Sequence, residues 1–274
     1  MIRNLKHNLT ARFAACENDV KAAQRLRFQV FYKEMSALAD SQTLSTQLDK
    51  DIIDTYCDHI LIIDHTSRDH DSAIMVDDGE LLGTYRVLTK DQAASNGGFY
   101  AQTEFDIASL VDGKPHLNCL ELGRSCVAKH ARSKPVLELL WQEIWNHTRL
   151  NHIDVLFGCA SLEGVQYHDN ELALRYLIQN HQAPKEWLTK PLPTSPLLKV
   201  SDQPLSKSQQ RQALAQLPAL IKSYLKVGAF VSPYAVVDFQ FNVTDVLVML
   251  PVQNISNKYR QRFDKIDQKP ENWG

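Results

Sequence analysis

A glutamate and an arginine interrupt an apolar run that otherwise has the character of a buried strand. The run is NCLELGRSCVAKH, residues 118–130, and the two charged residues are Glu121 and Arg124. Burying an unpaired charge is costly because the ion loses its hydration. A regular strand would place the two on opposite faces, but Gly123 between them permits a β-bulge that turns both to one face. The pattern predicts a carboxylate and a guanidinium side by side at a sheet surface.

Charged residues interrupt other apolar segments in the same way. Arg27 lies in the apolar face of a predicted helix, and Arg86 lies in a predicted strand with the sequence GELLGTYRVL. Asp51 and Asp54 belong to an acidic stretch, DKDIIDTYCDH, just before another strand. Each has an ordinary explanation, either a long side chain that reaches solvent or a solvated loop. Together they favour a shared polar pocket, where paired charges shift their pKa values.

The composition is that of an ordinary globular protein. The chain has 274 residues, of which 44% are hydrophobic and 23% charged, and its formal net charge is −2. This length buries a sizeable core as one large domain or two small ones. The small net charge predicts no general attraction to nucleic acid or to acidic membranes, so an anionic partner would need a local basic patch.

Sequence features also predict where the protein works. The five cysteines form no C-x-x-C pair, which favours a reducing compartment. The N-terminal stretch MIRNLKHNLTARF lacks the apolar region of a signal peptide, and no segment reaches the roughly 18 apolar residues of a membrane span. We therefore expect a cytoplasmic protein.

The order of predicted elements indicates an α/β fold with a mixed central sheet flanked by helices. Strands are predicted at 59–64, 79–88, 117–127 and 153–160, and helices at 19–38, 135–151 and 170–181. An antiparallel start followed by alternating strands and helices is typical of a mixed sheet.

The C-terminal third is expected to complete this domain rather than to form a second one. Five prolines crowd residues 183–210, which predicts a surface excursion or lid. A helix at 217–230 and one or two strands at 235–250 then rejoin the sheet. The expected division is a core at 1–182, the excursion at 183–210, a C-terminal extension of helix and strands at 211–251, and a polar tail at 252–274.

Four short motifs, in order, resemble those of the acyl-homoserine-lactone synthases and, more strongly, the ornithine-lipid N-acyltransferases. They are R-x-x-V-F from Arg27, D-x-x-D from Asp51, G-T-Y-R ending at Arg86, and E-L-G-R-S-C-V from Glu121. Both families have the GNAT-like acyltransferase fold. The second is favoured by FGCASLEG (157–164), by the pattern of residues 217–251, and by YKEMSA where the lactone synthases have a tryptophan. The resemblance spans residues 20–181 and 211–251.

The resemblance implies an N-acyltransferase that moves a 3-hydroxyacyl group from acyl carrier protein to the α-amine of L-ornithine, giving lyso-ornithine lipid. It places six residues in the site: Arg27, Asp51, Asp54, Arg86, Glu121 and Arg124. We expect no metal and no bound cofactor, because the donor carries its own phosphopantetheine.

Each charge then has an expected role in acyl transfer. The attacking amine must lose a proton, and Glu121 is the expected base. The α-carboxylate of ornithine needs a cation, which Arg124 or one of the other two arginines would supply as a bidentate fork. The δ-ammonium needs an anion, for which Asp51 or Asp54 is expected. Backbone N–H groups of the strand would stabilise the tetrahedral oxyanion.

A basic segment after the same strand is the expected contact of the donor. The segment AKHARSKP carries Lys129, His130, Arg132 and Lys134. GNAT enzymes have a glycine-rich pyrophosphate loop at this place, and this segment has no glycine. A helix start with basic residues suits the single phosphate of phosphopantetheine better than the pyrophosphate of coenzyme A. The alternative is an ordinary solvated turn.

Three other functions stay open from the sequence. One is a lactone-type synthase that uses S-adenosylmethionine, and another is an acyltransferase for a different amine, such as glycine or lysine. The third is a GNAT-like module that binds acyl carrier protein or lipid without catalysis. The helix at 217–230 also allows peripheral contact with the inner face of a membrane, although core packing is the favoured explanation of its apolar residues.

Overall fold

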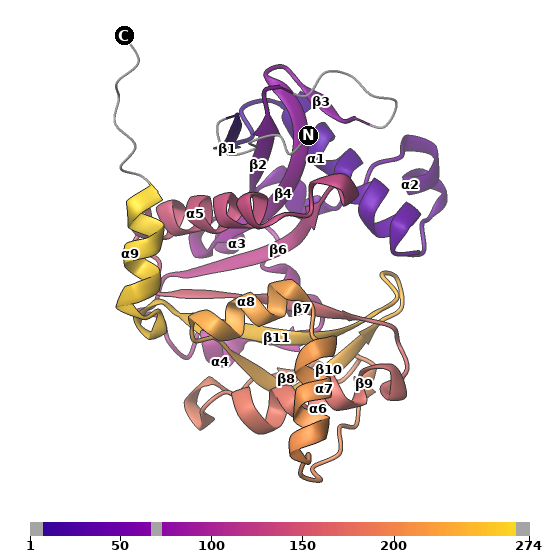
Figure 1. Cartoon of the computed structure of the whole chain (residues 1–274), viewed down its shortest axis with the longest axis vertical. Coiled ribbons are helices and arrows are strands. Elements are labelled where there is room, and N and C mark those ends of the chain that lie inside the picture. Colours follow the sequence, from indigo (N-terminus) through magenta and orange to yellow (C-terminus); the bar gives the residue numbers. More distant parts are fainter. Residues whose placement is uncertain (1–7, 67–72, 267–274) are drawn as a thin grey trace.

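A mixed β-sheet runs through the molecule, in a computed structural model that describes residues 8–66 and 73–266 (Figure 1). The main strand order is β1-β2-β4-β6-β7-β11-β10-β9, with the short β3 paired to β4. Within this order β6 and β7 pair in parallel and the other neighbours are antiparallel. The bounds are β1 (Leu9–Phe13), β2 (Asp58–Asp64), β3 (Met75–Val76), β4 (Gly79–Thr89), β6 (Cys119–Val127), β7 (Val155–Glu163), β9 (Leu197–Leu198), β10 (Phe230–Asp238) and β11 (Val243–Pro251).

Helices cover both faces of the sheet, so the expected mixed α/β fold is confirmed. One face packs against α5 (Lys134–Leu150), α6 (Tyr167–His181) and α8 (Ala219–Val227). The other packs against α1 (Glu17–Arg27) and a segment that contains α3 (Lys90–Ser95), η4 (Tyr100–Thr103) and α4 (Ala108–Val111). Figure 1 shows α5 and α8 in front of the sheet and α3 and α4 behind it.

Strand β2 is covered by helices on both faces, so its inward and outward side chains must both be apolar. Ile60 and Ile62 lie in the core on the α5 side, and Leu61 and Ile63 in the core on the α1 side. All four are fully buried. Burial of each side chain contributes about 1.5–3 kcal/mol, so the four together hold β2 between the layers.

The first helix is not regular along its whole length. The sequence predicts one helix at 19–38, whereas the α-helix ends at Arg27 and continues as a π-helix, η2 (Phe28–Glu34). The hydrogen bond from Met35 N to Val30 O spans five residues and has a length of 3.0 Å. A π-segment shifts the side chains that follow it and is frequent at functional sites.

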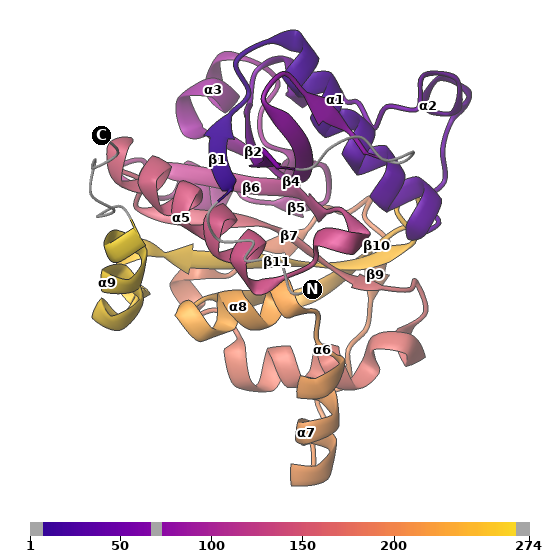
Figure 2. The ribbon, with the colours of Figure 1, turned by 45° about the horizontal axis from the view of Figure 1, so that its top comes forward.

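The Pro-rich range 183–210 contains only short elements until α7 (Lys207–Gln216) begins. It holds η6 (Lys185–Trp187), β8 (Lys190–Pro191) and β9. The strand β8 pairs with β5 (Phe105–Asp106), and β9 pairs with β10 at the edge of the main sheet. Figure 2, turned from the first view, shows α7 standing away from the sheet.

The range 235–250, predicted as one or two strands, forms the antiparallel pair β10 and β11. In α8, Ile221, Tyr224 and Val227 are buried, so its apolar residues pack into the core. After β11 come η7 (Val252–Asn254) and α9 (Asn257–Ile266); the last part of the predicted tail, 267–274, lies outside the described residues. None of the described helices is both long and apolar enough to cross a membrane.

The pairing of β6 with β7 is short, and the two strands then part. Three residue pairs form the parallel ladder, the last of them Glu121 with Phe157. Just past this point the backbones come so close that a Cβ at Gly158 would lie 2.1 Å from the carbonyl oxygen of Leu122. Only glycine fits at this position without a shift of the backbone.

A bulge in β6 lies beside this parting. On the β4 side, Thr84 pairs with Cys126 and Arg86 with Gly123, so Tyr85 faces two residues of β6. The predicted bulge therefore exists, but the residue with unusual backbone is Arg124, with φ of 51°, and not Gly123. A non-glycine residue in the left-handed region costs roughly 1–2 kcal/mol.

We predict that Gly158→Ala lowers the free energy of unfolding by about 1–3 kcal/mol, because its Cβ must displace the backbone of β6. Gly123→Ala is the matched control, since a Cβ there has no heavy atom within 4 Å, and it should change stability by less than about 0.5 kcal/mol. Denaturant unfolding of both variants measures the difference. Equal losses would mean that the close approach at Gly158 is not what holds the strands in place.

Candidate active site

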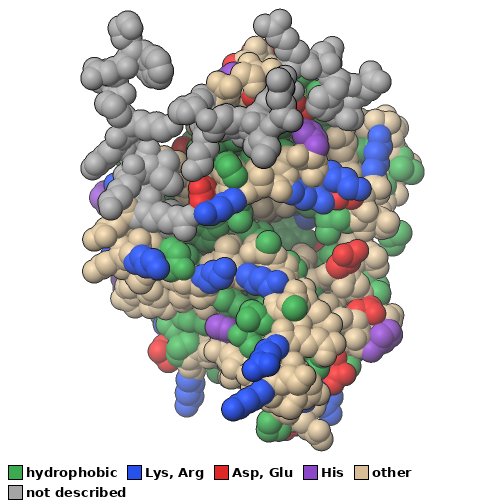
Figure 3. Space-filling view, viewed as in Figure 1, with side chains coloured by type: hydrophobic (Ala, Val, Ile, Leu, Met, Phe, Trp, Pro, Cys, Tyr) green, Lys and Arg blue, Asp and Glu red, His purple; other side chains and the backbone are tan. Residues whose placement is uncertain are grey.

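The parting of β6 and β7 opens a cavity of about 820 Å³. Residues of both strands line it, together with η2, the start of α5, and α8. On the face drawn in Figure 3, lysine and arginine side chains gather on both sides of the hollow across the middle of the molecule. Apolar side chains of α5, α8 and β11 line one part of the cavity: Leu137, Leu140, Leu220, Ile221, Val248 and Leu250. The cavity thus has a polar part near Glu121 and Arg124 and an apolar part near these helices.

Glu121 lies where the strands part. Its side chain lines the cavity, and its two oxygens accept hydrogen bonds from Tyr100 N at 2.8 Å and Ala101 N at 2.6 Å. Burial raises the pKa of Glu121 to about 7, although these two backbone N–H groups lower it in part. A carboxylate that titrates near neutral pH is matched to proton transfer from an amine.

Arg124 extends from the bulge into the same cavity. Its guanidinium lies over the rings of Tyr100 and Phe241, 4.7 and 4.3 Å from their centroids. Among the described residues it makes one side-chain hydrogen bond, from Nη2 to Asp51 Oδ2 at 3.3 Å. A guanidinium has five N–H groups, so Arg124 retains donors for a carboxylate in the cavity. The predicted pairing of Glu121 and Arg124 as two residues lining one site agrees with this geometry.

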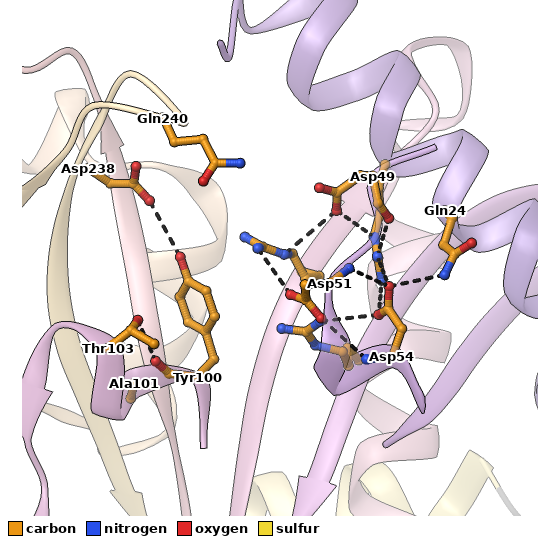
Figure 4. A network of polar contacts seen from close by, with 12 residues as sticks. Gln24, Asp49, Asp51, Asp54, Tyr100, Ala101, Thr103, Asp238 and Gln240 are labelled. Atoms are coloured by element: carbon orange, nitrogen blue, oxygen red, sulfur yellow. Dashed lines mark hydrogen bonds and ion pairs between the residues drawn. The ribbon is translucent and has the colours of Figure 1, made fainter. Parts of the chain in front are cut away.

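The other predicted charges form a buried network around Asp54 (Figure 4). Arg27 donates to both oxygens of Asp54, at 2.9 and 2.6 Å, and Arg86 donates to Asp54 Oδ1 at 3.1 Å. Gln24 adds a bond of 3.1 Å. Burial opposes ionisation of Asp54, but the hydrogen bonds and charges of Arg27 and the charge of Arg86 outweigh it and lower the pKa of this carboxyl.

Two further aspartates extend the network to the cavity. Asp51, at the start of η3 (Ile52–Thr55), accepts from Arg86 at 2.6 Å and from Arg124 at 3.3 Å. Asp49 lies 2.8 Å from Arg27 Nε and 3.6 Å from Arg124 Nε, as close ion pairs without hydrogen-bond geometry. Three aspartates thus face three arginines. Sequence reasoning missed Asp49, which belongs to the same acidic stretch, two residues before Asp51.

The structure therefore brings all six predicted residues together but gives them unequal positions. Glu121, Arg86 and Arg124 line the cavity, whereas Arg27, Asp51 and Asp54 do not. Arg27 is only 1% exposed and is held on all sides by its aspartates. The predicted contact of Asp54 with a δ-ammonium is difficult to reconcile with its occupied oxygens, so Asp54 fits a supporting position better.

The predicted donor segment divides in a similar way. Arg132 and Lys134 line the mouth of the cavity at the start of α5, where Arg132 also forms an ion pair with Glu34 of η2. Lys129 and His130 belong to η5 (Lys129–Ala131) and do not line the cavity; His130 lies 3.1 Å from Glu80 of β4. Two of the four basic residues are thus placed to meet a donor at the cavity mouth.

A second acidic group, two of whose three members line the cavity, was not predicted from the sequence. The side chains of Glu104, Asp238 and Asp245 place carboxylate oxygens within 4.8 Å of one another. We call these three residues the acidic cluster. Another group with suitable ligand types, Asp54, Cys57 and His59, is poorly suited to a metal because Asp54 is occupied by arginines.

Comparisons with known proteins identify the family. A family model described as an acetyltransferase (GNAT) domain matches residues 26–142. An L-ornithine N(alpha)-acyltransferase from Agrobacterium fabrum is 41% identical over 92% of this chain and 83% of its own length. A protein of the same name from Brucella abortus is 38% identical over 92% of this chain and 87% of its own. The chain belongs to the L-ornithine N(alpha)-acyltransferase family.

The solved structures found to be similar share less sequence with this L-ornithine N(alpha)-acyltransferase family member than the two relatives do. The N-acyl amino acid synthase FeeM, from uncultured soil microbes, is 12% identical with a TM-score of 0.42, over 89% of this chain and 91% of that one. The family resemblance predicted from the four motifs is confirmed by the two relatives and by the GNAT match.

For this family member we predict that Asp54→Asn lowers the free energy of unfolding by about 3–5 kcal/mol, because two buried arginines lose the carboxylate that they share and keep one aspartate each. Asp51→Asn is the comparison, since the Asp51 side chain is 26% exposed and water replaces part of its contacts; it should cost about 1 kcal/mol. Denaturant unfolding at neutral pH measures both. An effect of Asp54→Asn no larger than that of Asp51→Asn would show that Asp49, Asp51 and water compensate the two buried arginines.

Proposed function

We propose that this protein transfers a 3-hydroxyacyl group from acyl carrier protein to the α-amine of L-ornithine, forming lyso-ornithine lipid. The observation that carries the proposal is the cavity between β6 and β7, where Glu121 and Arg124 face the same space at the end of the shared ladder. The names of the relatives support ornithine as the acceptor.

The acceptor amine would attack the carbonyl carbon of the donor thioester beside Glu121. Glu121 accepts the proton that the attacking nitrogen loses, directly or through a water molecule. Collapse of the tetrahedral intermediate breaks the C–S bond, and the departing phosphopantetheine sulfur takes up the proton. The products are an amide and a free thiol, so atoms and charges balance without an oxidant or a metal.

Arg124 would position the acceptor by its α-carboxylate. It lines the cavity, keeps unused N–H donors, and is fixed between two aromatic rings, so a bidentate bond loses little further freedom. Backbone N–H groups of β6 and β7 beyond the ladder would receive the oxyanion, a contribution of about 3 kcal/mol for each donor.

Acyl carrier protein is proposed as the donor because of the mouth of the cavity. Arg132 and Lys134 are exposed there, at the start of a 17-residue helix whose N-terminus favours a phosphate. Basic side chains on both sides of the hollow would also attract an acidic carrier, although the net charge of the chain is −2. The acyl chain would occupy the apolar part of the cavity.

A cytoplasmic location, with peripheral contact at the membrane where the product leaves, belongs to the same proposal.

The first test incubates the purified protein with 3-hydroxyacyl carrier protein and, separately, with 3-hydroxyacyl coenzyme A. Each donor is offered ornithine, lysine, glycine or S-adenosylmethionine, and products are identified by mass spectrometry. We expect hydroxyacyl-ornithine from the carrier-bound donor at a kcat/KM at least roughly tenfold above that of any other combination, a difference of about 1.4 kcal/mol.

The other outcomes separate the alternatives. Faster turnover of the coenzyme A donor would overturn the carrier assignment, and acylation of a different amine would replace the acceptor. A lactone formed from S-adenosylmethionine would assign the chain a synthase activity. Binding of the donor without release of free thiol would favour a non-catalytic binding module.

A second prediction concerns the base. Since Glu121 must be ionised to accept a proton and burial raises its pKa to about 7, kcat should rise with pH through about pH 7. Glu121→Gln should lower kcat by roughly 10²- to 10⁴-fold and remove this rise. Thermal unfolding of the variant checks that the segment held by Glu121 keeps its structure. An unchanged pH profile in a folded variant would exclude Glu121 as the base.

A further inference from the structure

The acidic cluster consists of three carboxylates that come from separate parts of the chain. Glu104 follows η4, Asp238 ends β10, and Asp245 lies in the middle of β11. Asp238 and Asp245 line the same cavity as Glu121 and Arg124. Glu104 is 8% exposed and Asp245 is 3% exposed, so two of the three carboxylates are removed from solvent.

Among the residues that the structure describes, no cation forms an ion pair with this cluster, although the charge of Arg124 favours the ionised form of Asp245. Its hydrogen bonds come from neutral donors: Ser161 Oγ to Asp245 at 2.6 Å, Phe241 N to Asp238 at 3.0 Å, and Tyr100 OH to Asp238 at 3.4 Å. Oε2 of Glu104 is buried without a hydrogen-bond partner. A buried carboxylate oxygen without a donor is unfavourable by several kcal/mol, which points to a donor that arrives with a ligand.

The electrostatics of the cluster agree with a missing positive charge. Burial, and then the charges of Asp245 and Asp238, raise the pKa of Glu104 to about 8. Burial also raises the pKa of Asp245 to about 7, against the hydrogen bond from Ser161. A bound cation would favour the ionised forms of both groups.

Of the remaining carboxylates around the cavity, Glu163 is exposed to water and Glu34 pairs with Arg132, and the buried ones are already engaged. Asp49, Asp51 and Asp54 each lie against arginines, and Glu121 accepts two backbone N–H groups. The proposed acceptor is a diamino acid, and its second amine carries a positive charge at neutral pH. Among the described residues, the cluster is the buried carboxylate group at this cavity without an ion-pair partner, and an arriving ammonium would shift Glu104 and Asp245 to their ionised forms.

Tyr100 sets the distance between the two ends of such an acceptor. Its backbone N–H contacts Glu121, its ring lies under Arg124, and its hydroxyl contacts Asp238. Figure 4 shows the Tyr100 side chain pointing toward Asp238, across from the network of Asp49, Asp51 and Asp54. An acceptor with its α-amine near Glu121 and its α-carboxylate at Arg124 would thus reach the cluster by extending along one tyrosine side chain.

We propose that Glu104, Asp238 and Asp245 bind the side-chain ammonium of the acceptor and thereby select a diamino acid. Three carboxylates match the three N–H donors of a primary ammonium. This inference rests on the proposed function, and it replaces the expectation that Asp51 or Asp54 binds this group.

The test compares ornithine with norvaline, which has the same carbon chain without the second amine. Wild-type protein should prefer ornithine by roughly 10²- to 10⁴-fold in kcat/KM, because norvaline leaves the buried carboxylates unpaired. Asp238→Asn combined with Asp245→Asn should lower kcat/KM for ornithine by about the whole of the wild-type preference, at least roughly 100-fold, and leave that for norvaline within about threefold, so that the preference collapses. Glu163→Gln is the matched control, since Glu163 also lines the cavity but lies outside the cluster.

Several results would overturn the inference. They are a wild-type preference near one, an equal loss on both substrates in the double variant, or a preference that Glu163→Gln reduces as much. Should the double variant not fold, Asp245→Asn alone is measured in the same way. Activity that disappears with a chelator and returns with a divalent cation would assign the cluster to a metal. A wild-type protein that acylates a monoamine but not ornithine would instead contradict the proposed function.

Discussion

The ladder between β6 and β7 ends after three residue pairs, and the site depends on that ending. Beyond Glu121 and Phe157 the two strands no longer bond to each other, although each stays paired on its other side, to β4 and to β11. Two rigid edges therefore face an open space, and their backbone groups must find partners in water or in a substrate. The close approach of Gly158 to Leu122 fixes where the strands part.

The bulge turns this opening into a charged site. Arg124 adopts a positive φ at the bulge and projects into the cavity, at a conformational cost that its surroundings must offset. The rings of Tyr100 and Phe241 and the carboxylates of Asp49 and Asp51 hold its guanidinium. These contacts fix the direction of the side chain and offset the strain, so a non-glycine residue is tolerated there.

The network of Asp54 contributes position more than stability. Buried ion pairs recover little beyond the desolvation of their charges, and apolar residues of similar size would often be as stable. Here the pairs join the loop before β2 to α1 through Arg27 and to β4 through Arg86. Since Asp49 and Asp51 are held by the same arginines, the loop presents them to Arg124 in one fixed arrangement.

The sequence predicts most of the sheet and part of the site, for a reason that particular residues make clear. HILIID and the run around Glu121 are apolar enough to mark strands covered on both faces, so a charge inside them stands out. The π-helix after Arg27 does not show in periodicity, and residues 89–116 fold into short elements that no pattern marks. Tyr100 and its neighbours were missed for that reason.

Asp245, however, interrupts the apolar run VTDVLVML as Glu121 interrupts its own, and the same reasoning would have found it. Glu104, however, lies far from Asp238 and Asp245 in the sequence, and only the fold brings the three carboxylates together.

The two walls of the cavity differ in charge balance, and this difference bears on which amine of a diamino acid reacts. On one wall Arg86 and Arg124 lie against the aspartates of the network behind them, and Arg124 keeps donors available to a carboxylate. On the other wall the acidic cluster has no cation of its own among the described residues. An amine bound to that cluster is held in its protonated form, and an ammonium has no lone pair with which to attack a thioester. The amine beside Glu121 can lose its proton to a carboxylate whose pKa is raised to about 7. The same contacts that would bind the acceptor would therefore make its side-chain amine unreactive and leave the α-amine as the nucleophile.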